Sequence, residues 1–133
     1  MSTRLILATR NAGKLAEMRR LLDAAGLDVD LVGTDAYPDV PDVVETEATF
    51  AGNAMLKARA MCAATGVPAV ADDSGLCVDA LNGMPGILSA RWAGRHGDDA
   101  ANLALVLAQM SDVPDARRGA QFRCAAAIAV PDT

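Results

Sequence analysis

The sequence predicts an α/β fold, in which short apolar strands alternate with helices. The apolar stretch Arg4–Thr9 is followed by a polar turn and then by the helically spaced leucines of Leu15–Ala25. Another apolar segment ends directly in the acidic run Asp72–Gly75, and ligands of α/β sheets bind where the chain leaves a buried strand. The 133 residues, 52% of them hydrophobic, are enough for one domain with its own core.

The first half of the chain contains two predicted strands and two predicted helices. Arg4–Thr9 is apolar enough for a buried strand, and Leu27–Val32 alternates apolar and acidic residues as a half-buried strand does. Between them, Leu15–Ala25 is a helix with Gly26 as its C-terminal cap. After a loop that contains prolines and several acids, a second helix is expected over 49–65.

The second half is predicted to contain more strand than helix. Val67–Ala71 is a strand that leads into an acidic turn, and Cys77–Leu81 is a further short strand. Asp98 or Asp99 caps a third helix. Ala120–Val130 is a long strand that ends in a turn, and no segment follows to pair with it as a hairpin. We therefore expect this strand to have an exposed edge.

Composition and charge exclude several functional classes. The net charge of −5 argues against a protein that coats nucleic acid. A nucleotide remains compatible with it, since Mg²⁺ can bridge acidic side chains and phosphates. No signal peptide and no apolar run of membrane-spanning length is visible, so we expect a cytoplasmic protein without membrane contact. The three cysteines are widely spaced, which is typical of reduced thiols.

A candidate anion site lies between the first strand and the first helix. Its residues are Thr9, Arg10, Asn11, Ala12, Gly13 and Lys14. Free N–H groups at a helix N-terminus attract anions, Gly13 allows close backbone approach, and Lys14 supplies a cation. The spacing is not that of a Walker A loop. An ordinary strand–helix turn capped by Asn11 explains the same residues equally well.

Two further polar groups could extend this site. Thr49, Asn53 and Lys57 are spaced four apart, so they share one helix face, and Glu45 lies upstream where it could reach a metal ion. A solvated helix face with a threonine N-cap is the simpler explanation of that stripe.

The acidic run is the stronger signal. Asp72 and Asp73 could hold Mg²⁺ and activate water, with Ser74 beside them, whereas the alternative is an acidic turn that binds backbone amides.

Taken together, these motifs resemble the inosine triphosphate pyrophosphatase family. The matching segments, in order, are Leu7–Lys14 with Glu17, Glu45-Thr46, Thr49-Phe50 with Asn53 and Lys57–Arg59, Ala71–Leu76, and Gly83–Gly86 with Ser89–Arg91. Five motifs in register make the resemblance specific, and it extends from Leu5 to about Arg95.

The resemblance implies an enzyme that uses Mg²⁺ to hydrolyse ITP, dITP and XTP to the monophosphate and pyrophosphate. The turn 9–14 would bind triphosphate, Glu45, Asp72 and Asp73 would bind metal, and Asp73 would act as the general base. Ser74 would contact substrate, with Asn53 and Lys57 supporting the phosphate and metal cluster. The implied fold is a mixed twisted sheet flanked by helices, with two lobes and a central cleft, in a protein that forms a homodimer.

Members of the family are longer than this sequence, and their last third carries the base-recognition elements. The base-recognition segments of the family, Phe-Gly-Tyr-Asp-Pro, a later lysine and Ser-His-Arg, have no counterpart here. We therefore expect residues 1–133 to be a single pyrophosphatase domain truncated at its C-terminus. The alternatives are an inactive or nucleotide-binding-only fragment, a septum-inhibitor-type pyrophosphatase with another base preference, and a Mg²⁺-dependent phosphomonoesterase.

Overall fold

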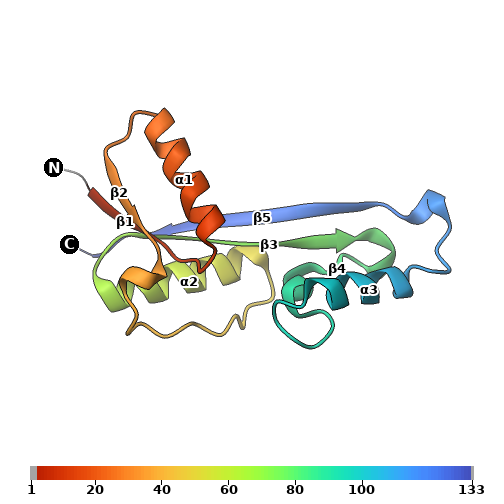
Figure 1. Cartoon of the computed structure of the whole chain (residues 1–133). Helices are drawn as coiled ribbons and strands as arrows, with labels where there is room; N and C mark the ends of the chain where they lie inside the picture. Colours follow the sequence, from red (N-terminus) through yellow and green to blue (C-terminus); the bar gives the residue numbers. More distant parts are fainter. Residues whose placement is uncertain (1–2, 133) are drawn as a thin grey trace. The chain divides into compact units, whose positions relative to one another are not determined.

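The chain forms a five-stranded mixed sheet flanked by helices, which confirms the predicted α/β class (Figure 1). The computed structural model describes residues 3–132. These residues divide into two compact units. The first unit contains the described residues up to Glu47, then Ala51–Asp72 and the residues from Ala126 onward. The second contains Ala48–Phe50 and Asp73–Ala125.

The first unit is built on parallel strands. β1 (Thr3–Leu7) pairs with β2 (Val29–Val32) on one side and with the start of β3 (Ala69–Val78) on the other. α1 (Ala12–Ala24) connects β1 to β2, and α2 (Phe50–Thr65) precedes β3. These are the right places for crossover helices, because parallel strands cannot be joined by a tight hairpin.

One small core holds the first unit together. Its buried members are Ile6 of β1, Met61 and Cys62 of α2, and Ala69 of β3. Ile6 and Ala69 are also partners in the β1–β3 register, so strand pairing and core packing fix the same alignment. α2 is therefore held against the sheet by its apolar face, which leaves its other residues available for polar contacts.

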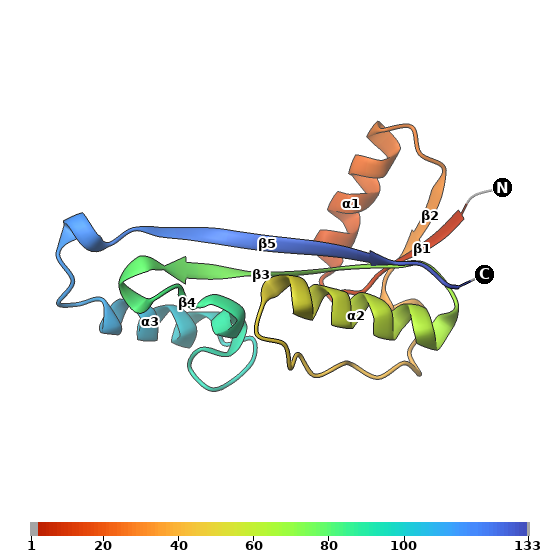
Figure 2. The ribbon, with the colours of Figure 1, turned by 180° about the vertical axis from the view of Figure 1, so that it is seen from behind.

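The second unit has antiparallel pairing and a separate core. The end of β3 pairs with β4 (Met84–Pro85), and β5 (Ala120–Ala129) lies along β3 in the views of Figures 1 and 2. α3 (Asp99–Gln109) supplies Val106 to a core that also contains Val78 and Met110. Both β3 and β5 contribute residues to each of the two units.

Several element predictions are confirmed with small shifts. Asn11 caps α1: its Oδ1 atom accepts from the backbone N–H groups of Gly13 and Lys14 at 2.9 and 3.2 Å. Asp98 caps α3 by accepting from Ala101. Gly26 follows α1 with a φ of 73°, a left-handed conformation that glycine adopts without strain.

The prediction of an acidic turn at 72–75 is wrong. These residues lie within the unbroken strand β3. Of the predicted strand Cys77–Leu81, Cys77 and Val78 are the end of β3, while Asp79–Leu81 is a short 3₁₀ helix. β3 is paired with β1, β4 and β5. Ladder hydrogen bonds therefore outweigh the turn preference of Asp, Ser and Gly.

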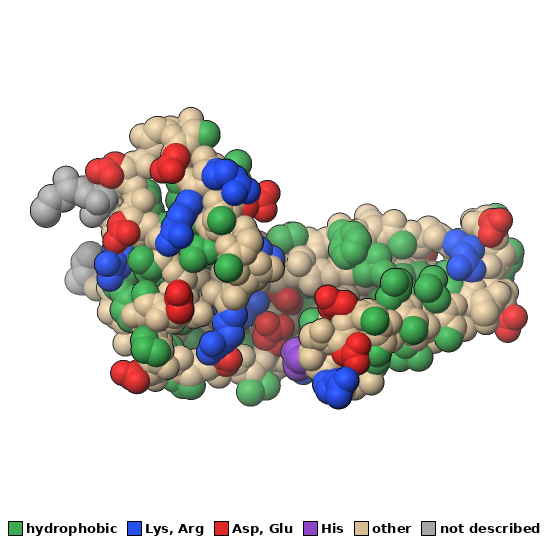
Figure 3. All heavy atoms as spheres, in the orientation of Figure 1, with side chains coloured by type: hydrophobic (Ala, Val, Ile, Leu, Met, Phe, Trp, Pro, Cys, Tyr) green, Lys and Arg blue, Asp and Glu red, His purple; other side chains and the backbone are tan. Residues whose placement is uncertain are grey.

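The surface of the second unit retains apolar side chains. Hydrophobic groups gather on the face shown in Figure 3, and Leu103, Leu107 and Phe122 are more than half exposed. Within the described residues β5 pairs with β3 alone, and its first five residues are all exposed. The expected exposed strand edge is thus present. Among the described helices, none has the length and apolar character needed to cross a bilayer.

Candidate active site

The turn between β1 and α1 is held in a fixed shape by its own side chains. The hydroxyl of Thr9 accepts from the Asn11 N–H at 3.1 Å, while the Thr9 carbonyl accepts from the Thr34 hydroxyl at 3.2 Å. Ala12, Gly13 and Lys14 form the first turn of α1, where N–H groups lack carbonyl partners within the helix. The turn also borders a pocket of about 170 Å³ in the first unit. Its backbone is therefore both ordered and accessible.

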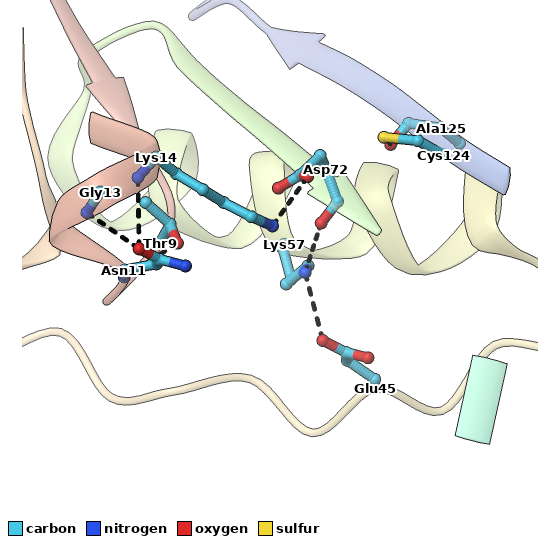
Figure 4. Close-up of polar contacts among 9 residues, drawn as sticks. All are labelled: Thr9, Asn11, Gly13, Lys14, Glu45, Lys57, Asp72, Cys124 and Ala125. Atoms are coloured by element: carbon cyan, nitrogen blue, oxygen red, sulfur yellow. Dashed lines mark hydrogen bonds and ion pairs between the residues drawn. The ribbon is translucent and has the colours of Figure 1, made fainter. Parts of the chain in front are cut away.

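Lys14 connects this turn to the acidic run. Its Nζ atom lies 3.0 Å from Oδ2 of Asp72 at the start of β3, as Figure 4 shows. Both side chains are partly accessible, with 44% of Lys14 and 24% of Asp72 exposed. The structure thus brings together two of the predicted site residues that are 58 positions apart in sequence.

Lys57 makes the second connection. From α2 its Nζ atom donates to the Asp72 carbonyl oxygen at 2.5 Å and lies 3.2 Å from Oε1 of Glu45. Glu45 comes from the irregular segment before α2 (Figure 4). Four predicted site residues therefore form one chain of contacts in the order Lys14, Asp72, Lys57, Glu45. Each lysine pairs with one carboxylate, and the Asp72 carbonyl connects the two pairs.

Arg10 takes part in a separate ion pair. Its Nη2 atom lies 2.9 Å from Asp42, and the two side chains are about 70% exposed. The hydrogen bond that Arg10 donates to the Asp42 carboxylate raises the pKa of Arg10, and the guanidinium stays charged at every working pH. Asp42 is a contact that sequence reasoning missed, because it is one of several acids scattered through an irregular loop.

Asn53 is the most buried polar residue of the group. Its side chain is fully buried in α2, and Oδ1 accepts from the backbone N–H of Glu47 at 2.9 Å. Its Nδ2 atom donates to the Glu47 carbonyl at 3.4 Å. The structure therefore directs this amide toward the loop that carries Glu45, and binding of substrate by Asn53 stays a prediction.

The remaining predicted residues, Asp73 and Ser74, belong to the second unit. On β3 Asp73 is half-buried and Ser74 is exposed. Ser89, which was noted only as part of a motif, fixes the strand just beyond them: its hydroxyl accepts from Leu76 N–H and donates to the Gly86 carbonyl.

The donor chemistry near Glu45 and Asp72 suits Mg²⁺. Carboxylate oxygens are hard ligands, and Mg²⁺ in nucleotide sites commonly takes one or two of them, completing its shell with water and phosphate oxygens. Within residues 3–132 no group of three His, Cys, Asp or Glu side chains is arranged to hold a metal. The predicted set of Glu45, Asp72 and Asp73 therefore stays a prediction.

Comparison with known proteins identifies relatives along nearly the whole chain. A dITP/XTP pyrophosphatase of Streptomyces avermitilis is 71% identical over 130 residues, which are 98% of this chain and 65% of that protein. A dITP/XTP pyrophosphatase of Nocardia farcinica is 64% identical over 96% of this chain and 63% of its own length. The chain thus spans slightly less than two thirds of these relatives.

Solved structures agree with this relationship. A nucleoside-triphosphatase, or dITP/XTP pyrophosphatase, of Mycobacterium abscessus superposes with a TM-score of 0.86 at 55% identity, covering 97% of this chain and 65% of that one. A HAM1 protein of Coxiella burnetii gives a TM-score of 0.86 at 41% identity, covering 95% of this chain and 62% of that one. The model of the Ham1 family matches residues 5–133. The resemblance drawn from the motifs is confirmed, and the chain belongs to the Ham1 family.

Proposed function

We propose that this chain carries the triphosphate-binding and metal-binding part of a nucleoside triphosphate pyrophosphatase. Its substrates would be ITP, dITP and XTP. Water attacks the α-phosphorus, the bond between that phosphorus and the bridging oxygen to the β-phosphate breaks, and the products are the nucleoside monophosphate and pyrophosphate. The names of the relatives support this class of reaction.

The observation that carries the proposal is the alternating chain Lys14, Asp72, Lys57, Glu45. A magnesium–triphosphate complex carries negative phosphate oxygens, which suit the two lysines, and a positive metal ion, which suits the two carboxylates. Its phosphate oxygens can replace a carboxylate beside each lysine, while the released carboxylates can turn to the metal. Partly exposed ion pairs contribute only about 0–1 kcal/mol, so this exchange has a small cost.

Each residue of the set has a defined task in this proposal. The N–H groups of the turn 9–14 and the Lys14 ammonium bind the phosphates, with Arg10 at the exposed end. Glu45 and Asp72 would hold Mg²⁺, which supplies neutralisation of the charge that develops on the phosphates. By the family pattern Asp73 takes the proton from the attacking water and Ser74 contacts the substrate.

The test is product analysis. The chain is incubated with Mg²⁺ and either ITP or GTP, and pyrophosphate and inorganic phosphate are measured separately. Pyrophosphate from ITP, with little from GTP, supports the proposal. Phosphate alone would instead indicate a phosphomonoesterase, and no product from either nucleotide would leave binding as the only function of this chain.

Sedimentation of the same sample tests the implied homodimer.

A further inference from the structure

Asn53 and Lys57 attach the same loop to α2 at two successive turns. The side-chain amide of Asn53 forms hydrogen bonds with both the N–H and the carbonyl of Glu47. Lys57 forms an ion pair with the carboxylate of Glu45, two residues earlier. The two helix residues are four apart, which places their side chains on one face. One helix face therefore determines where the segment from Glu45 to Glu47 lies.

The segment needs this attachment because it has no regular structure of its own. No helix or strand is present between the 3₁₀ turn Thr34–Ala36 and α2. The Lys57–Glu45 pair is partly exposed, with 22% and 28% of the two side chains accessible, and such pairs give little positional restraint. The amide of Asn53 is completely buried, so its bonds to Glu47 are shielded from water.

We infer that Asn53 is a positioning residue for Glu45: its buried amide holds the Glu47 backbone and thereby places the Glu45 carboxylate beside Lys57. This inference rests on the proposed function for the task of Glu45 as a metal ligand. Groups that orient metal ligands typically change metal affinity about 10- to 100-fold when they are removed. The same loss is expected here although Asn53 itself need not touch the metal.

The first test removes the contact from the helix side. Asn53→Ala is compared with Asn102→Ala, a matched control. Asn102 is also a buried helix asparagine bonded to two backbone groups, those of Ala93 and Ala90, but it lies in the second unit. Asn53→Ala should raise hydrogen exchange at residues 45–47 at least 10-fold and weaken Mn²⁺ binding about 10- to 100-fold. Asn102→Ala should change neither.

The second test removes one of the two hydrogen bonds, that of the Glu47 N–H, from the loop side and leaves every helix residue unchanged. Glu47 is exposed, so its side chain can be replaced. Glu47→Pro deletes the N–H that Asn53 accepts, while Glu47→Ala keeps it. The proline variant should lose Mn²⁺ affinity as Asn53→Ala does, and the alanine variant should bind as the unmodified chain does. This pair decides the question even if Asn53→Ala does not fold.

The outcomes separate the inference from the proposed function. Unchanged exchange at 45–47 in Asn53→Ala and Glu47→Pro overturns the inference, as does an equal loss of Mn²⁺ affinity in the two controls. If the unmodified chain binds no Mn²⁺, the metal-binding part of the proposed function fails. The exchange measurement, which needs no metal, then decides by itself whether Asn53 holds the loop.

Discussion

The ammonium nitrogen of Lys14 lies 3.0 Å from the carboxylate of Asp72, which joins the first turn of α1 to the start of β3. The Lys14 side chain extends to Asp72 from the first turn of α1, where the Gly13 and Lys14 N–H groups donate to Asn11 Oδ1 (Figure 4). A phosphate would bind the Lys14 ammonium once that side chain leaves Asp72, and it would bind the N–H groups of Gly13 and Lys14 once they leave Asn11 Oδ1. The pair is therefore the clearest point at which to test phosphate binding.

Replacing Lys14 should weaken triphosphate binding. Lys14→Ala removes a charge-assisted hydrogen bond worth about 1.5–3 kcal/mol, which corresponds to an increase in KM of roughly 10- to 100-fold. Lys14→Arg keeps the charge and should lose less, although a guanidinium does not reproduce a compact ammonium. Steady-state kinetics with ITP measure both. An unchanged KM in Lys14→Ala would show that the phosphates bind elsewhere.

Asn11 allows the structural and ligand-binding tasks of the turn to be separated. Its Oδ1 atom caps α1, and an aspartate caps a helix equally well, so Asn11→Asp should keep the melting temperature. The added negative charge should nevertheless repel a triphosphate and raise KM. Asn11→Ala should lower the free energy of unfolding by about 1 kcal/mol. If Asn11→Asp binds nucleotide normally, the turn does not contact the phosphates.

Asp73 is the residue on which turnover should depend most. Asp73→Asn keeps the shape of a half-buried side chain on β3 but removes the base, so kcat should fall about 10²- to 10⁴-fold while the fold stays intact. Asp112→Asn, at an exposed position, is the control and should be fully active. The measurement is pyrophosphate release together with circular dichroism. Near-normal turnover in Asp73→Asn would contradict its assignment as the general base.

The fold was predictable where local signals and tertiary pairing agree. Asn11 and the pair Asp98 or Asp99 were named as candidate caps because a cap depends on local sequence, and the helices that Asn11 and Asp98 begin lie where periodicity placed them. The run 72–75 was misjudged because it belongs to β3, and the pairing of that strand with β1, β4 and β5 is a long-range property. Propensity alone favours a turn for Asp-Asp-Ser-Gly.

The sequence indicated which residues belong to the candidate site, but not which of them contact each other. Lys14, Lys57, Glu45 and Asp72 were each singled out as chemistry-bearing groups, and the structure joins them into one chain of contacts. Nothing in the spacing indicated which lysine meets which carboxylate. The hydrogen bonds between Asn53 and Glu47 could not be predicted either. On the Glu47 side they involve the backbone N–H and carbonyl, which every residue except proline carries.

The three cysteines should differ sharply in reactivity. Cys124 is exposed on β5, whereas Cys62 and Cys77 are buried at 7% and 8% exposure, and none of the three forms a disulfide among the described residues. A thiol reagent such as DTNB should therefore modify one thiol quickly in the folded chain and the other two only after denaturation. Cys124→Ser should abolish the fast phase. Fast modification of more than one thiol would show that a core opens readily.

Gly75 should tolerate no side chain. A Cβ atom at this buried position of β3 would collide with the Gly86 carbonyl oxygen and lie 2.6 Å from Oγ of Ser89. That hydroxyl also bonds Leu76 and Gly86, so it cannot move aside without breaking both contacts. We expect Gly75→Ala to lower the free energy of unfolding by about 1–3 kcal/mol, measured by urea denaturation.

Two variants separate this collision from other causes. At Gly66 a Cβ atom meets nothing within 4 Å, but the φ of 71° is left-handed, so Gly66→Ala reports backbone strain alone, about 1–2 kcal/mol. Ser89→Ala combined with Gly75→Ala should not restore stability, because the Gly86 carbonyl remains in the way. Full stability of Gly75→Ala would mean that β3 and the Gly86 segment are not packed as closely as described. The strand that carries Asp73 and Ser74 would then lack a rigid support two residues beyond the proposed base.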